Sequence, residues 1–143
     1  RAAEVCRCYG LPHIDLKSSV YDIPDLKAIE ETLEANPDIA VVYCCHHETG
    51  TGVLNPIREI GAAAHRHGAI MVADTTSSLG MIPIDVERDN IDFCMASAQK
   101  GIMAMTGLSF VIGRTASNMP DSRKTARCAS PRRCRQSMPP SKG

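Results

Sequence analysis

The sequence predicts an α/β fold, with a partial, mainly parallel sheet and flanking helices. Four short apolar runs have the length and composition of buried strands: residues 39–45, which are β-branched in their centre, and residues 69–73, 91–96 and 108–112. Between the first two runs, residues 56–67 carry apolar side chains at helical spacing, so a helix is expected to join two parallel strands. The 143 residues suffice for the core of one domain.

Two helices are expected before the first strand. The first covers residues 1–9, where one face is apolar through Ala2, Val5 and Tyr9. The second begins at Pro24, a residue that suits a first helical turn, and ends at the pair Asn36-Pro37. Its apolar face consists of Leu26, Ile29 and Leu33.

The apolar run at residues 39–45 is expected to be buried on both faces, as in the centre of a parallel sheet. In the helix that follows, Asn55 is expected to cap the N-terminus, Pro56 to occupy the first turn and Gly68 to end the helix. The face of this helix that points to the core consists of Ile57, Ile60 and Ala64.

Composition argues against several classes of protein. No apolar run approaches the roughly 20 residues that cross a bilayer, so no membrane segment is expected. The seven cysteines form no Cys-x-x-Cys pair and three lie in apolar runs, which favours a reduced, cytoplasmic protein without disulfides or a zinc site. The chain opens at Arg1 in a helical pattern, without an initiator methionine, so we expect a fragment.

Charge is unevenly distributed along the chain. Residues 1–114 hold 9 Lys and Arg against 15 Asp and Glu, whereas residues 115–143 hold 7 against 1. The second part also has no Val, Ile, Leu, Phe, Tyr or Trp, so it cannot bury enough apolar surface to offset its ordering entropy. We expect residues 115–143 to be a disordered tail or the product of a frame error. Nucleic acid is not expected as a partner, because this basic tail has no aromatic side chain to stack on bases.

Three polar side chains follow the ends of predicted strands: Thr49, Asp74 and Lys100. Ligands of open α/β sheets bind beyond the carboxyl ends of the strands. Asp74 directly follows a buried run and needs a cationic or hydrogen-bonding partner, which a protonated pyridine ring supplies. Lys100 lies between two apolar runs and could form a Schiff base if its amine were desolvated. The pattern fits pyridoxal phosphate chemistry, although turn capping and a solvated lysine explain the same spacing.

Three ordered segments resemble the active-site segments of class V, fold-type I aminotransferases, which are pyridoxal phosphate enzymes: residues 46–61, 73–80 and 97–101. Thr49 and Asp74 are 25 residues apart, and Asp74 and Lys100 are 26 apart, as in that family. The resemblance covers residues 1–114 and implies that they are part of a cofactor-binding large domain. It implies that Lys100 is the catalytic lysine that holds the cofactor as an imine, and that Asp74 pairs with the pyridine nitrogen. It also implies that Thr49 binds near the ring and that Gln99 lies near the cofactor phosphate.

Within that class, the sequence most resembles the 2-aminoethylphosphonate:pyruvate aminotransferases, at residues 46–49, 82–85 and 104–112. This implies transamination between a small amino donor, 2-aminoethylphosphonate, and the 2-oxo acid pyruvate, in a homodimeric parent protein. An alanine- or serine-glyoxylate aminotransferase is an open alternative, as is a catalytically inactive α/β interaction module. The family's upstream phosphate-gripping segment and its C-terminal small domain are missing, so the chain by itself is expected to be inactive.

Other side chains near these strand ends are expected to be structural. The adjacent residues 46–48, His-His-Glu, diverge from one another and favour turn contacts over a metal site. Cys44 and Cys45 lack a neighbouring base that would make a thiolate, so they are expected to pack against the sheet. Ser77 and Ser78 are expected to satisfy the turn that follows Asp74.

Overall fold

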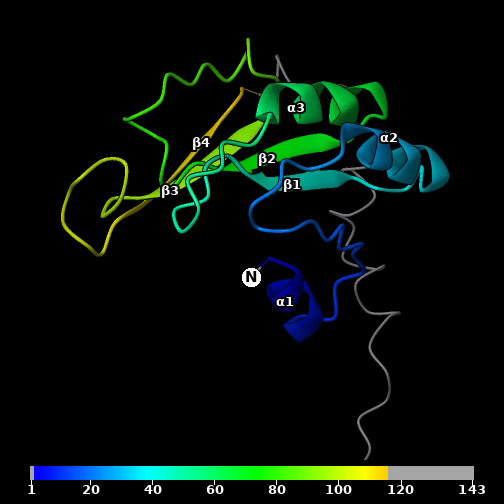
Figure 1. Ribbon diagram of the computed structural model, residues 1–143, viewed down its shortest axis with the longest axis horizontal. Coiled ribbons are helices and arrows are strands. Elements are labelled where there is room, and N and C mark those ends of the chain that lie inside the picture. The colour runs from blue at the N-terminus through cyan, green and yellow to red at the C-terminus, as the bar shows by residue number, and fades with distance from the viewer. Residues whose placement is uncertain (1, 116–143) are drawn as a thin grey trace, which may run out of the picture.

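The computed structural model describes residues 2–115 (Figure 1). These residues form three helices, α1 (Ala2–Cys8), α2 (Leu26–Ala35) and α3 (Ile57–Arg66), and four strands, β1 (Val41–Cys45), β2 (Ile70–Asp74), β3 (Phe93–Ser97) and β4 (Ser109–Gly113). The strand order is β1-β2-β3-β4, with β1, β2 and β3 parallel and β4 antiparallel to β3. The predicted α/β fold with a mainly parallel sheet is therefore confirmed. The predicted tail lies outside the described residues, except for Thr115.

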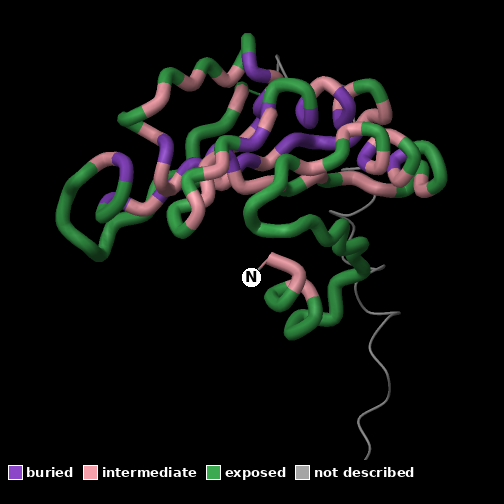
Figure 2. The backbone as a smooth tube through the Cα atoms, in the orientation of Figure 1, coloured by how far each residue is buried: buried purple, intermediate pink, exposed green. Residues whose placement is uncertain are grey.

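Helices α2 and α3 cover one face of the sheet, and the buried residues gather between these helices and the sheet (Figure 2). The predicted inner face of α3 is confirmed, because Ile57, Ile60 and Ala64 are all buried. Full burial of a side chain such as Ile60 stabilises the fold by roughly 1.5–3 kcal/mol. The same cluster contains side chains from α2, β2 and β3: Ile29, Leu33, Met71, Ala73 and Cys94.

The start of α2 differs slightly from the prediction. The helix begins after Asp25, whose carboxylate accepts a hydrogen bond from the Lys27 N–H at 2.9 Å. Pro24 therefore lies outside the helix rather than in its first turn, because Asp25 satisfies one of the unpaired N–H groups at the helix start.

The start of α3 corrects another expectation. Asn55 does not cap the helix; Pro56 holds the N-cap position, without a side-chain cap bond. The Asn55 amide instead donates from Nδ2 to the Cys45 carbonyl at 2.8 Å, which ties the helix start to the end of β1. Gly68 ends the helix region as predicted, with a φ of +67° that favours glycine.

Burial of β1 on both faces was a wrong expectation. Val42 and Cys44 pack against the core, whereas Val41 and Tyr43, on the opposite face, are 51% and 43% exposed. The helices cover only one face of the sheet, and this is why an apolar strand is half-buried.

None of the helices within residues 2–115 is long and apolar enough to span a membrane.

Helix α1 forms within the predicted residues 1–9, but its apolar face covers nothing. It stands apart from the sheet, on the side opposite α3 (Figure 1). No residue of α1 is buried, and Tyr9, just beyond it, is 78% exposed. The helical spacing therefore predicted the local structure correctly without predicting a packing partner.

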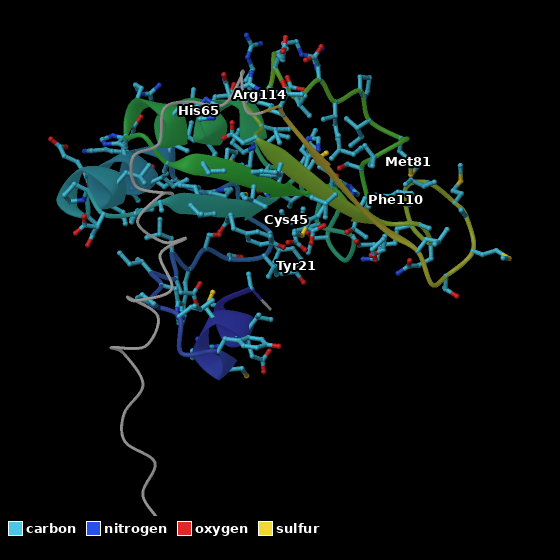
Figure 3. The ribbon with its side chains drawn as sticks, turned by 180° about the vertical axis from the view of Figure 1, so that it is seen from behind. Tyr21, Cys45, His65, Met81, Phe110 and Arg114 are labelled. Atoms are coloured by element: carbon cyan, nitrogen blue, oxygen red, sulfur yellow. The ribbon has the colours of Figure 1, made fainter. Side chains whose placement is uncertain are left out.

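A buried carboxylate, Asp92, holds α3, β2 and β4 together at the end of the sheet opposite the predicted site. Its Oδ2 lies 2.7 Å from His65 Nε2 and accepts the Met71 N–H at 2.7 Å. Its Oδ1 lies 3.6 Å from Arg114 Nη1, and its backbone carbonyl accepts the Arg114 N–H at 2.9 Å. Figure 3 shows His65 and Arg114 close together at this end, with Cys45 and Phe110 toward the other end.

Candidate active site

The loops after β1, β2 and β3 meet at one edge of the sheet, because these strands are parallel. Cys45 pairs with Asp74 in register, and the His46 N–H donates to the Asp74 carbonyl at 2.9 Å. On the other side of β2, the Thr75 N–H donates to the Met95 carbonyl of β3 at 2.8 Å. Thr49 and Lys100, which follow these strands as predicted, therefore lie on the same edge as Asp74, which is the last residue of β2 rather than the residue after it.

Lys100 and Thr49 are in direct contact. Lys100 Nζ donates to Thr49 Oγ1 at 3.0 Å, across 51 positions of sequence, and both residues are exposed. The turn that carries Lys100 is held by backbone bonds, with the Met103 N–H donating to the Lys100 carbonyl at 2.8 Å and the Gly101 N–H donating to the Thr76 carbonyl at 3.1 Å. The position of Lys100 therefore depends on the loop after β2 as well as on β3, the strand that precedes it.

Asp74 is half-buried at the end of β2, and three hydrogen bonds hold its carboxylate. Oδ1 accepts the Thr76 N–H at 3.0 Å and the Thr76 hydroxyl at 2.6 Å. Oδ2 accepts the Tyr43 hydroxyl at 3.0 Å. Through Thr76, which also receives the Gly101 N–H, the carboxylate is linked to the turn that holds Lys100.

Tyr43 is a site residue that the sequence reasoning missed. It lies two positions before Cys45 and therefore on the same face of the sheet as Asp74. Burial and the neighbouring Asp74 carboxylate raise the pKa of Tyr43, so its phenol remains a donor at neutral pH. The alternation of side chains along β1 places Tyr43 on the face of Cys45, but the register that brings it beside Asp74 is visible only in the structure.

Two histidine–serine pairs join the loop after β1 to the loop after β2. His46 Nδ1 lies 2.9 Å from Ser78 Oγ, and His47 Nδ1 lies 3.2 Å from Ser77 Oγ. Burial lowers the pKa of His46, which favours its neutral form. The two serines were expected to satisfy the turn after Asp74; Ser78 does so by donating to the Thr75 carbonyl at 3.4 Å, and both also anchor the neighbouring loop.

The cysteines at the end of β1 are thiols rather than nucleophiles. Burial, with Glu48 nearby, raises the pKa of Cys44 to about 11 and that of Cys45 to about 12. Within residues 2–115, no group of three His, Cys, Asp or Glu side chains is arranged to hold a metal ion. Gln99, predicted to lie near the cofactor phosphate, is exposed in the turn beside Lys100.

Close backbone packing keeps the Lys100 turn against the loop after β2. A Cβ added at Gly101 would lie 2.4 Å from the Leu79 carbonyl oxygen, which is closer than any real Cβ contact. Gly101 is buried against the Leu79 backbone, so only a residue without a side chain fits at position 101. Thr49, Asp74 and Lys100 are thus brought to one edge, with Lys100 bound to Thr49 and linked to Asp74 through Thr76.

Comparison with known proteins identifies the family of this chain. A family model described as "Aminotransferase class-V" matches residues 2–134. The chain is 41% identical over 116 residues to a 2-aminoethylphosphonate--pyruvate transaminase of Aeromonas hydrophila and 40% identical over 114 residues to one of Salmonella paratyphi B. These alignments cover 81% and 80% of this chain but only 30% and 31% of the relatives, so the chain spans about a third of their length.

The fold is also shared with solved structures. A pyridoxamine-pyruvate aminotransferase from Mesorhizobium loti superimposes with a TM-score of 0.67 and 31% identity, over 82% of this chain and 29% of the other. The family match extends over most of the sequence, and the chain shares the fold of this structure. The chain therefore belongs to the class V aminotransferase family.

Proposed function

We propose that this chain is part of the large domain of an aminotransferase that transfers the amino group of 2-aminoethylphosphonate to pyruvate, giving phosphonoacetaldehyde and alanine. The single observation that carries the proposal is the convergence of Asp74, Lys100 and Thr49 at the carboxyl edge of a parallel sheet. The choice of substrates rests on the two relatives of that name at 40% and 41% identity.

Class V aminotransferases use pyridoxal phosphate, and the side chains at this edge fit its ring. An ionised carboxylate has about four lone-pair positions. Thr76 takes two on Asp74 and Tyr43 takes one, which leaves a position on Oδ2 for a ring N–H. Lys100 offers a primary amine for covalent attachment, held by one hydroxyl at an exposed position. We assign the phosphate to the neighbourhood of Gln99.

When bound, pyridoxal phosphate supplies an electron-withdrawing ring that takes up the electron pair released when a C–H bond of the amino donor breaks. Asp74 keeps a proton on the ring nitrogen, because its negative charge stabilises the protonated form. The Lys100 amine would hold the cofactor and, once free, would act as the general acid and base that takes up and returns the proton of the donor carbon. Thr49 Oγ1, 3.0 Å from Lys100 Nζ, would orient this amine.

The division of the chain follows from the same assignment. We assign the large-domain segments to residues 1–114; the expected tail at residues 115–143 lies outside the described residues, except for Thr115. The parent protein is a homodimer whose partners are a small amino donor and a 2-oxo acid, with no role for nucleic acid or a membrane.

Reductive trapping tests the cofactor assignment directly. The 143-residue chain is incubated with pyridoxal phosphate and treated with borohydride, and the modified peptide is identified by mass spectrometry. We expect the label on the peptide that contains Lys100, and its loss in Lys100→Ala but not in Lys27→Ala, which removes the exposed lysine of α2. A label that persists in Lys100→Ala would remove Lys100 from its role.

Substrate choice is tested in the intact parent protein. Alanine formed from pyruvate is measured with 2-aminoethylphosphonate as donor, and glycine formed from glyoxylate is measured with alanine or serine as donor. We expect the first reaction to be faster. A faster reaction with glyoxylate would favour the alanine- or serine-glyoxylate enzyme and contradict the proposed substrates.

A further inference from the structure

Tyr43 contacts the residue that the proposed function assigns to the ring nitrogen, although it lies on a different strand. Its hydroxyl donates to Asp74 Oδ2 at 3.0 Å, whereas Asp74 Oδ1 is held twice by Thr76. Tyr43 pairs in register with Val72, two residues before Asp74, so the length of the phenol ring carries its hydroxyl to the end of the neighbouring strand. This contact is not local in sequence and depends on the β1–β2 register.

The two oxygens of Asp74 are therefore held differently. Thr76, two residues after Asp74, donates to Oδ1 from both its backbone N–H and its hydroxyl. These bonds do not fix Oδ2, so the carboxylate can still rotate unless another group binds Oδ2. The Tyr43 hydroxyl is that group, since it binds Oδ2 from the adjacent strand. A third hydrogen bond to a charged group adds to the orientation of the carboxylate and leaves one lone-pair position open.

We propose that Tyr43 is a positioning residue, whose hydroxyl fixes Oδ2 of Asp74 so that its remaining lone pair stays available to the ring N–H of bound pyridoxal phosphate. This inference rests on the proposed function. It assigns to this chain a residue that acts on the cofactor through Asp74, without touching the reacting atoms.

The electrostatic surroundings of the phenol support this role. The titratable groups near Tyr43 are Asp74 on β2 and the thiols Cys44 and Cys45 on its own strand. Burial is the largest cause that raises the pKa of Tyr43, and the Asp74 carboxylate is the next. The phenol therefore stays protonated and keeps donating to Oδ2 throughout the neutral pH range.

The contact itself can be tested without cofactor. The chain has three tyrosines, and labelling with difluorotyrosine, whose phenol ionises at lower pH than tyrosine, allows ¹⁹F NMR titration before strongly alkaline conditions. The resonance lost in Tyr43→Phe should titrate above free difluorotyrosine. In Asp74→Asn it should titrate at lower pH, because the charge of the carboxylate and its hydrogen bond are lost while burial stays. The same titration in both proteins would overturn the proposal.

The action on the cofactor is tested by binding. Tyr43→Phe should bind pyridoxal phosphate about tenfold more weakly, the loss expected for one hydrogen bond to a charged group. It should bind the 1-deaza analogue, which has C–H in place of the ring nitrogen, with unchanged affinity. Tyr21→Phe, at a 76% exposed tyrosine, is the matched control and should bind both compounds like the wild type.

The outcomes separate this inference from the proposed function. Equal weakening for pyridoxal phosphate and its deaza analogue would show that Tyr43 supports the fold and does not position Asp74, and would overturn the inference. An intact parent protein that binds neither compound would count against the proposed function, and the ¹⁹F titration would then decide whether Tyr43 holds Asp74.

Discussion

Replacing Gly101 by alanine tests how the fold places Lys100. An added Cβ would lie 2.4 Å from the Leu79 carbonyl oxygen and 3.3 Å from the Leu79 nitrogen. Ordinary contacts begin at 3.4 Å, so the two backbone segments must separate by about 1 Å. Neither segment can yield by moving the end of a flexible side chain, and the Gly101 N–H bond to the Thr76 carbonyl is stretched as they part. We expect a loss of about 1–3 kcal/mol in the free energy of unfolding, the usual cost of overpacking.

Gly50→Ala provides the matched control for this change. Gly50 lies in the exposed turn beside Thr49, and an added Cβ would meet no atom within 4 Å. Its φ is also outside the left-handed region, so alanine fits there without backbone strain. The free energy of unfolding should change by no more than about 0.5 kcal/mol.

Urea unfolding of the two variants measures the first effect, and borohydride trapping of pyridoxal phosphate on Lys100 measures the second. Gly101→Ala should trap the cofactor more slowly, because a displacement of about 1 Å moves the amine away from its productive position. Gly50→Ala should trap it at the wild-type rate. Equal unfolding free energies and equal trapping rates in the two variants would refute the reasoning that Gly101 sets the position of Lys100.

Three further predictions concern charge and protonation. Asp74→Asn keeps the shape of the side chain but removes its charge, so the intact protein should still bind pyridoxal phosphate yet lose most alanine formation; near-normal turnover would contradict the assignment. The Arg88 guanidinium and the Asp85 N–H hold the pKa of Asp89 at about 2, below the ordinary value of 3.8. The ionised Asp89 therefore stabilises the fold above pH 3.8 and loses this contribution as the pH falls toward 2, so urea midpoints of Asp89→Asn should vary less across that range than those of the wild type. Burial raises the pKa of Cys45 to about 12, so iodoacetamide at about pH 8 should modify Cys45 far more slowly than exposed Cys8; similar rates by mass spectrometry would show a thiolate that this environment does not explain.

Helices and strands were predictable because their signals are local. The run at residues 69–73 is apolar throughout and became β2, whose side chains are mostly buried. The spacing of Ile57, Ile60 and Ala64 predicted the buried face of α3 in the same way. The exposure of β1 was not predictable, since Val41 and Tyr43 suit a buried strand equally well. Whether such a strand is covered depends on helices elsewhere in the chain, which strand composition does not encode.

The position of the candidate site was predictable from the sequence, but the partners of its side chains were not. Parallel strands bring their carboxyl ends together, so residues that follow them, such as Thr49, Asp74 and Lys100, could be placed on one edge from the order of elements alone. The contact between Lys100 Nζ and Thr49 Oγ1 is consistent with that expectation. Partners such as Tyr43 depend on the register between strands, and a slip of one residue would turn Tyr43 to the other face. The sequence pattern does not specify that register.

The candidate site and the uncovered face of the sheet depend on the same packing. Asp74 lies on the face opposite the helices, and the register places four exposed apolar side chains on that face: Val41, Tyr43, Met95 and Val111. Charged contacts such as those of Asp74 and Lys100 are strongest where water is excluded, because the effective dielectric constant is then lower. Packing that covers this face would bury its apolar side chains and also remove water from around Asp74. The curated relatives are about three times as long as the matched segment, so in those proteins there is enough further chain to supply such a cover. We therefore expect the stability of this sheet face and the reactivity of Lys100 to depend on the same packing event.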